Sequence, residues 1–244
     1  MKYRYSFLFL FLLGLLSLWK FGGFSFVVSK PSEIIIFLQT FLVSDLFLHN
    51  LLKTTWRVFI SCAIALILGV VMAFLKRTKW AFIYDLFYPT QFIAAAVLTL
   101  LCVVIFGLSG YIPIIVVTIV IIPNIFVATE IGINHMRTEF LEIGKLYSTD
   151  KLKTLRYIIF PQLAPYIANG FIRAHAIAWK IVITAELFVV SEGIGYLLNN
   201  YYRLMQFEKL FGVTIIIVII GMVFDYGIRK IKEAYIRDYN PQSI

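Results

Sequence analysis

The sequence predicts an all-α integral membrane protein with about six transmembrane helices. Of the 244 residues, 61% are hydrophobic and only 14% are charged, and the mean hydropathy is +0.90. This composition is too apolar for the surface of a soluble domain. Apolar runs of about 18 residues or more, long enough to cross a bilayer as a helix, also recur along the chain. The net charge of +9 does not indicate a nucleic-acid partner, because the basic residues stand between the apolar runs, where the positive-inside rule places them.

The first two predicted spans cover residues 5–22 and 55–75. The first run follows Lys2 and Arg4, and no small-residue cleavage site follows it, so we expect an uncleaved span with a cytoplasmic amino terminus. The mixed polar and apolar residues 22–50 predict an outer loop that carries a half-buried helix. The second span ends at the basic residues 76–79 (KRTK), which indicate the cytoplasmic side.

The remaining spans are expected at residues 86–107, 111–130, 163–188 and 209–227. Residues 86–129 contain no charge and are too many for one helix, so Gly107, Gly110 and Pro113 predict a tight outer turn between two spans. Pro123 is expected to kink the fourth span. The basic residues 229–232 (RKIK) follow the sixth span.

The distribution of charge predicts that both termini are cytoplasmic. In the six-span topology, fourteen lysines and arginines lie in cytoplasmic segments and six in outer ones, while Arg173 and Lys180 fall inside the fifth span. The same topology places residues 138–160, between the fourth and fifth spans, in the cytoplasm.

This cytoplasmic segment has a pattern that a simple connection does not need. Ile143, Leu146 and Tyr147 share one helical face, and a second apolar set includes Leu155. Good N-cap residues at positions 148–150 separate the sets, which predicts two short amphipathic helices that meet at a corner. Two readings remain open: a hairpin lying on lipid headgroups, or a docking surface for a soluble cytoplasmic partner.

The segment resembles the cytoplasmic "EAA" loop of binding-protein-dependent ABC importer permeases. Glu142, Ile143 and Gly144 stand at the family's acid-small-small triplet, and Phe160 and Pro161 stand at the hydrophobic-proline pair that closes the loop. Ser148 replaces the family's usual glycine, so we expect either a differently built corner or a first helix that runs further.

The resemblance extends over about residues 45–235. Residues 49–59 resemble the family's entry to its second span, with Asn50 and Arg57 at matching positions. Residues 170–188 and 191–198 are similar to the fifth span and following loop of the nitrate, sulfonate, taurine and thiamine-precursor branch. Residues 91–96 lack the prolines that this branch often carries there, which weakens inference of a substrate. The resemblance implies the type I ABC importer permease fold and a multi-pass protein of the bacterial cytoplasmic (inner) membrane.

Several partners are implied by this resemblance. They are a cytoplasmic ABC ATPase dimer, a second permease subunit (with a homodimer favoured), a periplasmic or lipid-anchored substrate-binding protein and membrane lipid. ATP and Mg²⁺ would be bound by the ATPase, because this chain lacks the phosphate-cradling G-x-x-x-x-G-K-[ST] loop, and no cofactor, metal or catalytic residue is expected here. The coupling residues would be Glu142, Ile143, Gly144, Leu146, Tyr147 and Ser148. For Glu142, the alternative is an exposed acid paired with Lys145.

Polar residues of the fifth span predict a translocation pathway. Asn169, Arg173, Lys180 and Thr184 fall on one helical face, which would suit an anionic solute such as a sulfonate or nitrate. Arg173 alternatively snorkels to the interface, and Lys180 alternatively pairs with an acid such as Glu186 of the partner subunit. Glu186 is also assigned to the pathway.

The loop after the fifth span is predicted to form an outer gate. Ser191, Gly193 and Gly195 would let the chain turn back toward the pore mouth, although ordinary turn glycines give the same pattern. Two other function classes were compared. An ion-gradient-driven secondary transporter or channel would usually be longer and have internal repeats. A membrane enzyme would need an intramembrane cluster of His, Asp or Glu, which the sequence lacks.

Overall fold

Long helices form from the apolar stretches between the charged segments. The computed structural model describes residues 37–42, 44–75, 87–137, 139 and 150–239. The predicted first span and most of the outer loop after it, together with residues 140–149 of the cytoplasmic segment, lie outside the described residues. The described part contains no strand. Its elements are α3 (Asp45–Leu75), the 3₁₀ helix η1 (Tyr88–Phe92), α5 (Ala95–Phe106), α6 (Ile112–Asn134), α8 (Lys151–Thr154), the π-helix η2 (Leu155–Ile159), α9 (Phe160–Val189), α10 (Ile194–Arg203) and α11 (Phe207–Tyr239).

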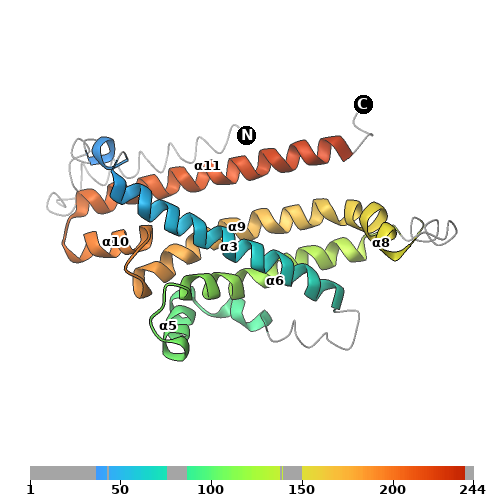
Figure 1. Ribbon diagram of the computed structural model, residues 1–244, viewed down its shortest axis with the longest axis horizontal. Coiled ribbons are helices and arrows are strands. Elements are labelled where there is room, and N and C mark those ends of the chain that lie inside the picture. The colour runs from blue at the N-terminus through green and yellow to red at the C-terminus, as the bar shows by residue number, and fades with distance from the viewer. Residues whose placement is uncertain (1–36, 43, 76–86, 138, 140–149, 240–244) are drawn as a thin grey trace, which may run out of the picture.

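The four longest helices, α3, α6, α9 and α11, lie roughly along one axis (Figure 1). They contain the predicted spans over 55–75, 111–130, 163–188 and 209–227. Helix α10 lies at one end of this bundle, called the α10 end, and α8 and η2 lie at the other, called the α8 end (Figure 1). By length and composition, three described helices could cross a membrane, and a fourth span results if α9 and α10, which meet at a 50° bend, are counted together.

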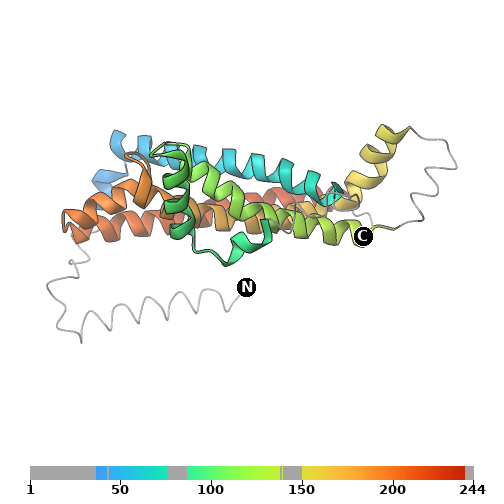
Figure 2. The ribbon, with the colours of Figure 1, turned by 90° about the horizontal axis from the view of Figure 1, so that it is seen from below.

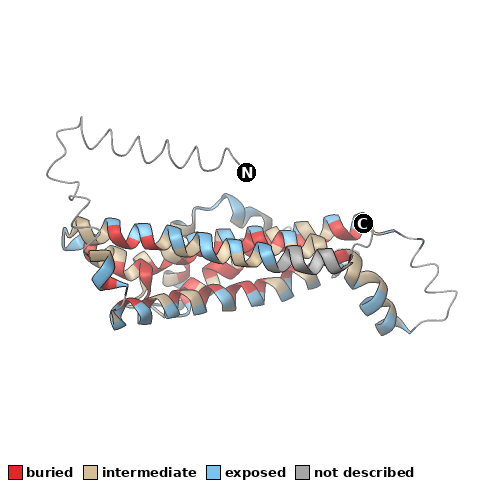
Figure 3. Ribbon diagram, turned by 90° about the horizontal axis from the view of Figure 1, so that it is seen from above, coloured by how far each residue is buried: buried red, intermediate tan, exposed pale blue. Residues whose placement is uncertain are grey.

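Helix α6 is the centre of the core and packs most extensively against α9 and α3. Its side chains at Ile112, Val116, Ile121 and Ile125 are fully buried. Gly170 of α9 lets these helices approach closely, because a Cβ atom at that position would lie 2.5 Å from the Cβ of Ala128. Buried and exposed positions alternate along the long helices, as expected for a bundle that keeps one face of each helix inside (Figure 3).

The prediction of one continuous span over residues 86–107 is wrong. Helix α5 has 12 residues, fewer than the roughly 20 that a transmembrane helix needs, and it runs across the axis of the long helices (Figures 1 and 2). Pro89 lies in the first turn of the separate helix η1, and the extended backbone at Ile93 and Ala94 separates η1 from α5. The turn expected at Gly107 does end α5, where φ is +74°, a value that favours glycine. Pro123 lies inside α6, which continues through it.

Candidate functional site

Helix α9 carries an uncovered polar stripe, formed by Asn169, Arg173, Lys180 and Thr184. The first three side chains are exposed and Thr184 is half-buried, with its hydroxyl donating to the carbonyl oxygen of Lys180 at 3.0 Å. The stripe lies opposite the side of α9 that carries the fully buried Ala178. Sequence spacing therefore predicted correctly that these four residues share one face.

The charged side-chain groups of Arg173 and Lys180 form no ion pair or hydrogen bond with another residue that the structure describes. A lysine or arginine in contact with hydrocarbon is costly, so cations on a membrane-crossing helix ordinarily face a water-filled cavity or another chain. The exposed polar stripe is the surface expected of a helix that lines such a cavity.

Glu186 does not belong to the stripe, although the sequence assigned it to the same pathway. It lies two positions after Thr184, and this rotates its side chain by about 200° around the helix, into the bundle. Its side chain has no exposed surface. Arg57 of α3, itself only 7% exposed, donates to Glu186 Oε1 at 2.6 Å. Glu186 is thus paired inside this chain with Arg57 and not with Lys180.

Further hydrogen bonds turn this ion pair into a connected network, called the turn clamp. Its members are Asn50, Thr54 and Arg57 of α3, Glu186 of α9 and the backbone of residues 192–195. The hydroxyl of Thr54 donates to the Glu186 carboxylate at 2.8 Å, and the backbone N–H of Gly195 donates to Glu186 Oε2 at 3.0 Å. Every oxygen of the buried carboxylate therefore has a donor, which is the condition for a stable buried charge.

Two glycines of the predicted outer gate loop form part of this clamp. Gly193 has φ +116°, and a Cβ atom there would lie 2.4 Å from the carboxyl carbon of Glu186. A Cβ at Gly195 would lie 2.4 Å from the carbonyl oxygen of Ile183. These glycines are needed because the backbone passes directly against Glu186. Ser191 is exposed beside them.

At the surface of the clamp, Lys53 and Glu192 form an exposed ion pair at 3.0 Å. The Lys53 hydrogen bond lowers the pKa of the Glu192 carboxyl below its ordinary value. Because this folded-state pKa is depressed, any contribution to stability is present at neutral pH and is lost as the pH falls through the lowered value. The contribution is small, since both side chains are nearly half exposed.

The clamp residues on α3 were not identified as a site from the sequence. Asn50 and Arg57 were noticed only as positions that match a family, and Thr54 was not noticed at all. The sequence does contain a pattern that indicates this site. Positions 50, 54, 57 and 61 are all polar in an otherwise apolar helix, and their intervals of four, three and four residues place them on one helical face. All four side chains are buried.

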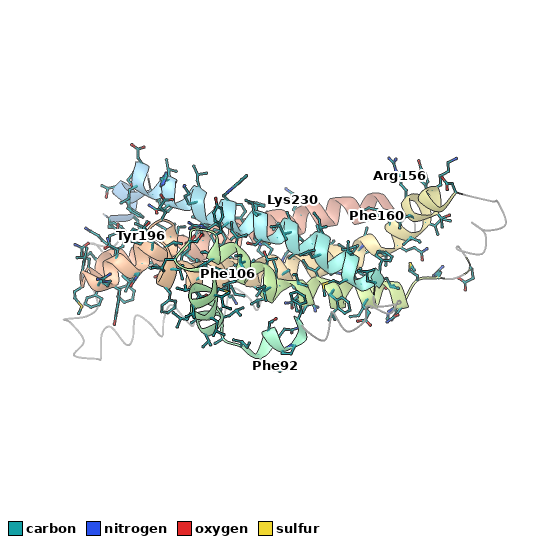
Figure 4. The ribbon with its side chains drawn as sticks, turned by 60° about the horizontal axis from the view of Figure 1, so that its bottom comes forward. Phe92, Phe106, Arg156, Phe160, Tyr196 and Lys230 are labelled. Carbon is teal, nitrogen blue, oxygen red and sulfur yellow. The ribbon has the colours of Figure 1, made fainter. Side chains whose placement is uncertain are left out.

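A third feature is an arm at the α8 end, formed by α8 and η2 and leading into Phe160. Figure 2 shows this arm leaving the bundle, and Figure 4 shows Arg156 and Phe160 on it, away from the other helices. Its exposed side chains include Leu155 (45%), Tyr157 (70%) and Phe160 (54%). The predicted coupling residues Glu142, Ile143, Gly144, Leu146, Tyr147 and Ser148 lie outside the described residues.

The base of the arm is attached to the end of α6. The backbone N–H of Arg137 donates to the side-chain oxygen of Gln162 at 3.1 Å. One turn further along α9, the ring of Tyr166 stacks on His135, with 6.1 Å between ring centroids. These contacts join the two helices between which the cytoplasmic segment was predicted. No group of three or more potential metal ligands occurs among the described residues.

The sequence is similar to one protein family and to several named permease proteins. The sequence pattern of the family described as "Binding-protein-dependent transport system inner membrane component" matches residues 65–233. A Bacillus subtilis protein named as an aliphatic sulfonates transport permease is 22% identical over 91% of this chain and 84% of its own length. A Methanocaldococcus jannaschii protein named as an ABC transporter permease is 27% identical over 72% of this chain and 66% of its own length. The nitrate import permease NrtB of Synechocystis is 23% identical over 45% of this chain and 40% of its own length.

Solved structures show the same fold. One chain of an amino acid ABC transporter, crystallised with histidines, superposes with a TM-score of 0.63 at 17% identity. The match covers 83% of this chain and 98% of that one. A chain of the inward-facing MetNI methionine ABC transporter superposes with a TM-score of 0.61 at 15% identity, over 87% of this chain and all of the other.

Proposed function

We infer that this chain, which belongs to the family of binding-protein-dependent transport system inner membrane components, lines the solute pathway of its transporter with α9 and receives mechanical work through the arm at the α8 end. The chain is a membrane-embedded permease subunit of an ABC importer and not itself an enzyme. The use of α9 and of the arm is the part that we propose.

The projecting arm is the observation that carries the coupling proposal. An arm that only connected two spans would have no reason to present three large apolar side chains outside the bundle. Exposed aromatic and aliphatic side chains of this kind typically anchor a protein partner. We assign them, together with Glu142 and Tyr147 of the adjacent segment, to the contact with a cytoplasmic ATPase dimer that binds ATP and Mg²⁺.

This assignment fixes the orientation of the chain. The α8 end is cytoplasmic and the α10 end faces the outside, where a soluble or lipid-anchored binding protein would deliver the solute. The end of α11 is then cytoplasmic, and with the first span that the sequence predicts, the amino terminus would be on the same side. ATP-driven closure of the ATPase pair would displace the arm and, through its attachments at Gln162 and Tyr166, rock α6 and α9 together.

A second copy of the chain completes the pathway in this proposal. The stripe on α9 is uncovered in the single chain, and in a bilayer its two cations require water or a polar partner. Two copies that face each other across a water-filled space would meet that requirement. A homodimer is the simplest arrangement that provides it.

Transport driven by ATP separates this function from the alternative of an ion-gradient-driven carrier. We expect proteoliposomes that contain the chain with its ATPase and binding protein to take up labelled solute when ATP is on the α8 side. Uptake should persist with ionophores that collapse ion gradients and stop with a non-hydrolysable ATP analogue. Uptake that follows an ion gradient without ATP would favour the alternative.

The stripe predicts that the solute is a small anion, which agrees with the sulfonate and nitrate named for similar permeases. We expect Lys180→Gln, and likewise Arg173→Gln, to lower the initial uptake rate of the anion at least tenfold, since a lost contact between a charged group and a ligand typically costs about 1.5–3 kcal/mol. Arg203→Gln, which removes an exposed cation of α10 outside the stripe, is the matched control and should leave uptake unchanged. Unchanged uptake in Lys180→Gln would remove this residue from the pathway.

A further inference from the structure

The turn between α9 and α10 is held by side chains at each of three successive backbone amides. The N–H of Gly193 donates to Asn50 Oδ1 at 2.7 Å, that of Ile194 to Thr54 Oγ1 at 2.9 Å, and that of Gly195 to the Glu186 carboxylate at 3.0 Å. Two of these acceptors belong to α3, which is more than 130 residues away in the sequence. The turn is therefore attached to α3 by hydrogen bonds and is not a free loop.

Arg57 holds the same turn from its other side. Its guanidinium donates both to Glu186 at 2.6 Å and to the carbonyl oxygen of Glu192 at 2.8 Å. Separating the turn from α3 would leave the N–H groups of Gly193 and Ile194 without their acceptors and would remove one of the two acceptors of the buried Arg57 guanidinium, and buried polar groups without partners are costly. The clamp thus opposes any hinge motion of the turn relative to α3.

Helix α10 is joined to α3, and also to α11, by an independent apolar contact. Ile194, Leu197 and Tyr201 on its buried face pack against Phe47 of α3 and against Val213 and Ile216 of α11. Polar contacts at the turn and apolar contacts along α10 therefore both attach this segment to α3.

We propose that the turn clamp joins the α10 ends of α3 and α9, the turn and α10 into one rigid unit, called the α10 unit, and that the outer mouth opens by movement of this whole unit. The turn is not the moving gate; it is a fixed part of a larger body. The movement of the mouth rests on the proposed function, whereas the rigidity of the α10 unit rests on the contacts alone. Asn50, Thr54, Arg57 and Glu186 are positioning residues, because they act through the turn and do not contact the solute.

Amide hydrogen exchange on the isolated full-length chain in lipid nanodiscs tests the rigidity, with or without a functional partner. We expect slow exchange at Gly193, Ile194 and Gly195 in the wild-type chain and at least tenfold faster exchange in Thr54→Val, which removes one acceptor at nearly constant volume. Thr55→Val is the control, because Thr55 is the next residue of the same helix and lies outside the clamp. Fast exchange in the wild-type chain, or equal exchange in all three proteins, would overturn the proposal.

Cross-linking in the reconstituted transporter tests the movement. Lys53 and Glu192 form the exposed pair above the clamp, so Lys53→Cys and Glu192→Cys can be joined by a short bifunctional maleimide without touching the buried residues. If the turn and α3 move together, ATP-driven uptake should stay within about twofold of its value before linking. Uptake that falls to background on linking would show that the turn must leave α3. Loss of uptake in the double-cysteine variant before linking would also contradict the proposal, since the rigid unit does not require the surface ion pair.

A wild-type transporter that shows no ATP-driven uptake would refute the proposed function. The result of the hydrogen-exchange experiment would still hold, because it does not depend on transport.

Discussion

Replacing Glu186 by leucine is expected to destabilise the chain by about 3–5 kcal/mol, the range measured when one member of a buried ion pair is removed. The change leaves the Arg57 guanidinium without its anion in a site that is only 7% exposed. It also removes the acceptor of the Thr54 hydroxyl and of the Gly195 N–H. Equilibrium unfolding in mixed micelles, followed by the fluorescence of the native tryptophans, measures the change.

A double-mutant cycle shows whether the pair itself is the cause. Arg57→Met combined with Glu186→Leu removes both charges, and we expect a smaller loss of stability than in Glu186→Leu alone, because no buried charge is left unpaired. Lys53→Met is the control for loss of a cation on the same helix, and the exposure of its ion pair predicts little change. Additive effects of the two single variants would contradict an energetic coupling of Arg57 and Glu186.

Replacing Leu155 and Tyr157 together by serine is expected to reduce ATP-driven uptake at least tenfold while leaving the stability of the chain nearly unchanged. Both side chains are exposed on the arm, so their loss opens no cavity in the core. If they anchor the ATPase, their removal costs the affinity that buried apolar anchors provide, typically more than 1 kcal/mol each.

The matched control uses the same residue type at the other end of the bundle. Tyr202 on α10 is 61% exposed, close to the 70% of Tyr157, and Tyr202→Ser should leave uptake at the wild-type rate. Equal losses of uptake from changes at the two ends would contradict a specific role for the arm.

The apolar runs allowed four long helices of the bundle to be predicted, because a helix that crosses hydrocarbon must satisfy its own backbone and be apolar along its length. The same argument failed at residues 86–107. This stretch is as apolar as a span, but local backbone geometry, set by Pro89 and the extended residues Ile93 and Ala94, breaks it into two short helices. Hydropathy reports composition and does not detect such a break.

The stripe on α9 could be predicted because the spacings of four, seven and four residues between Asn169, Arg173, Lys180 and Thr184 place them on one helical face. The clamp was not, since it joins Thr54 to Glu186 across 132 residues. Nothing local to Glu186 distinguishes an acid that faces a pathway from one that is enclosed by a distant helix. The structure supplied the missing contact, and with it the reason for glycine at positions 193 and 195.

Co-purification is the most direct test of the claim that the arm couples this permease to a separate ATPase. We expect the tagged wild-type chain and Tyr202→Ser, extracted in mild detergent, to retain the ATPase in stoichiometric amount. The Leu155→Ser, Tyr157→Ser double variant should lose most of it while eluting as the same folded species in size-exclusion chromatography. If the ATPase instead stays bound to the arm variant and is lost from the Tyr202→Ser chain, the contact lies at the α10 end. That result would contradict the claim that the arm couples the permease to the ATPase.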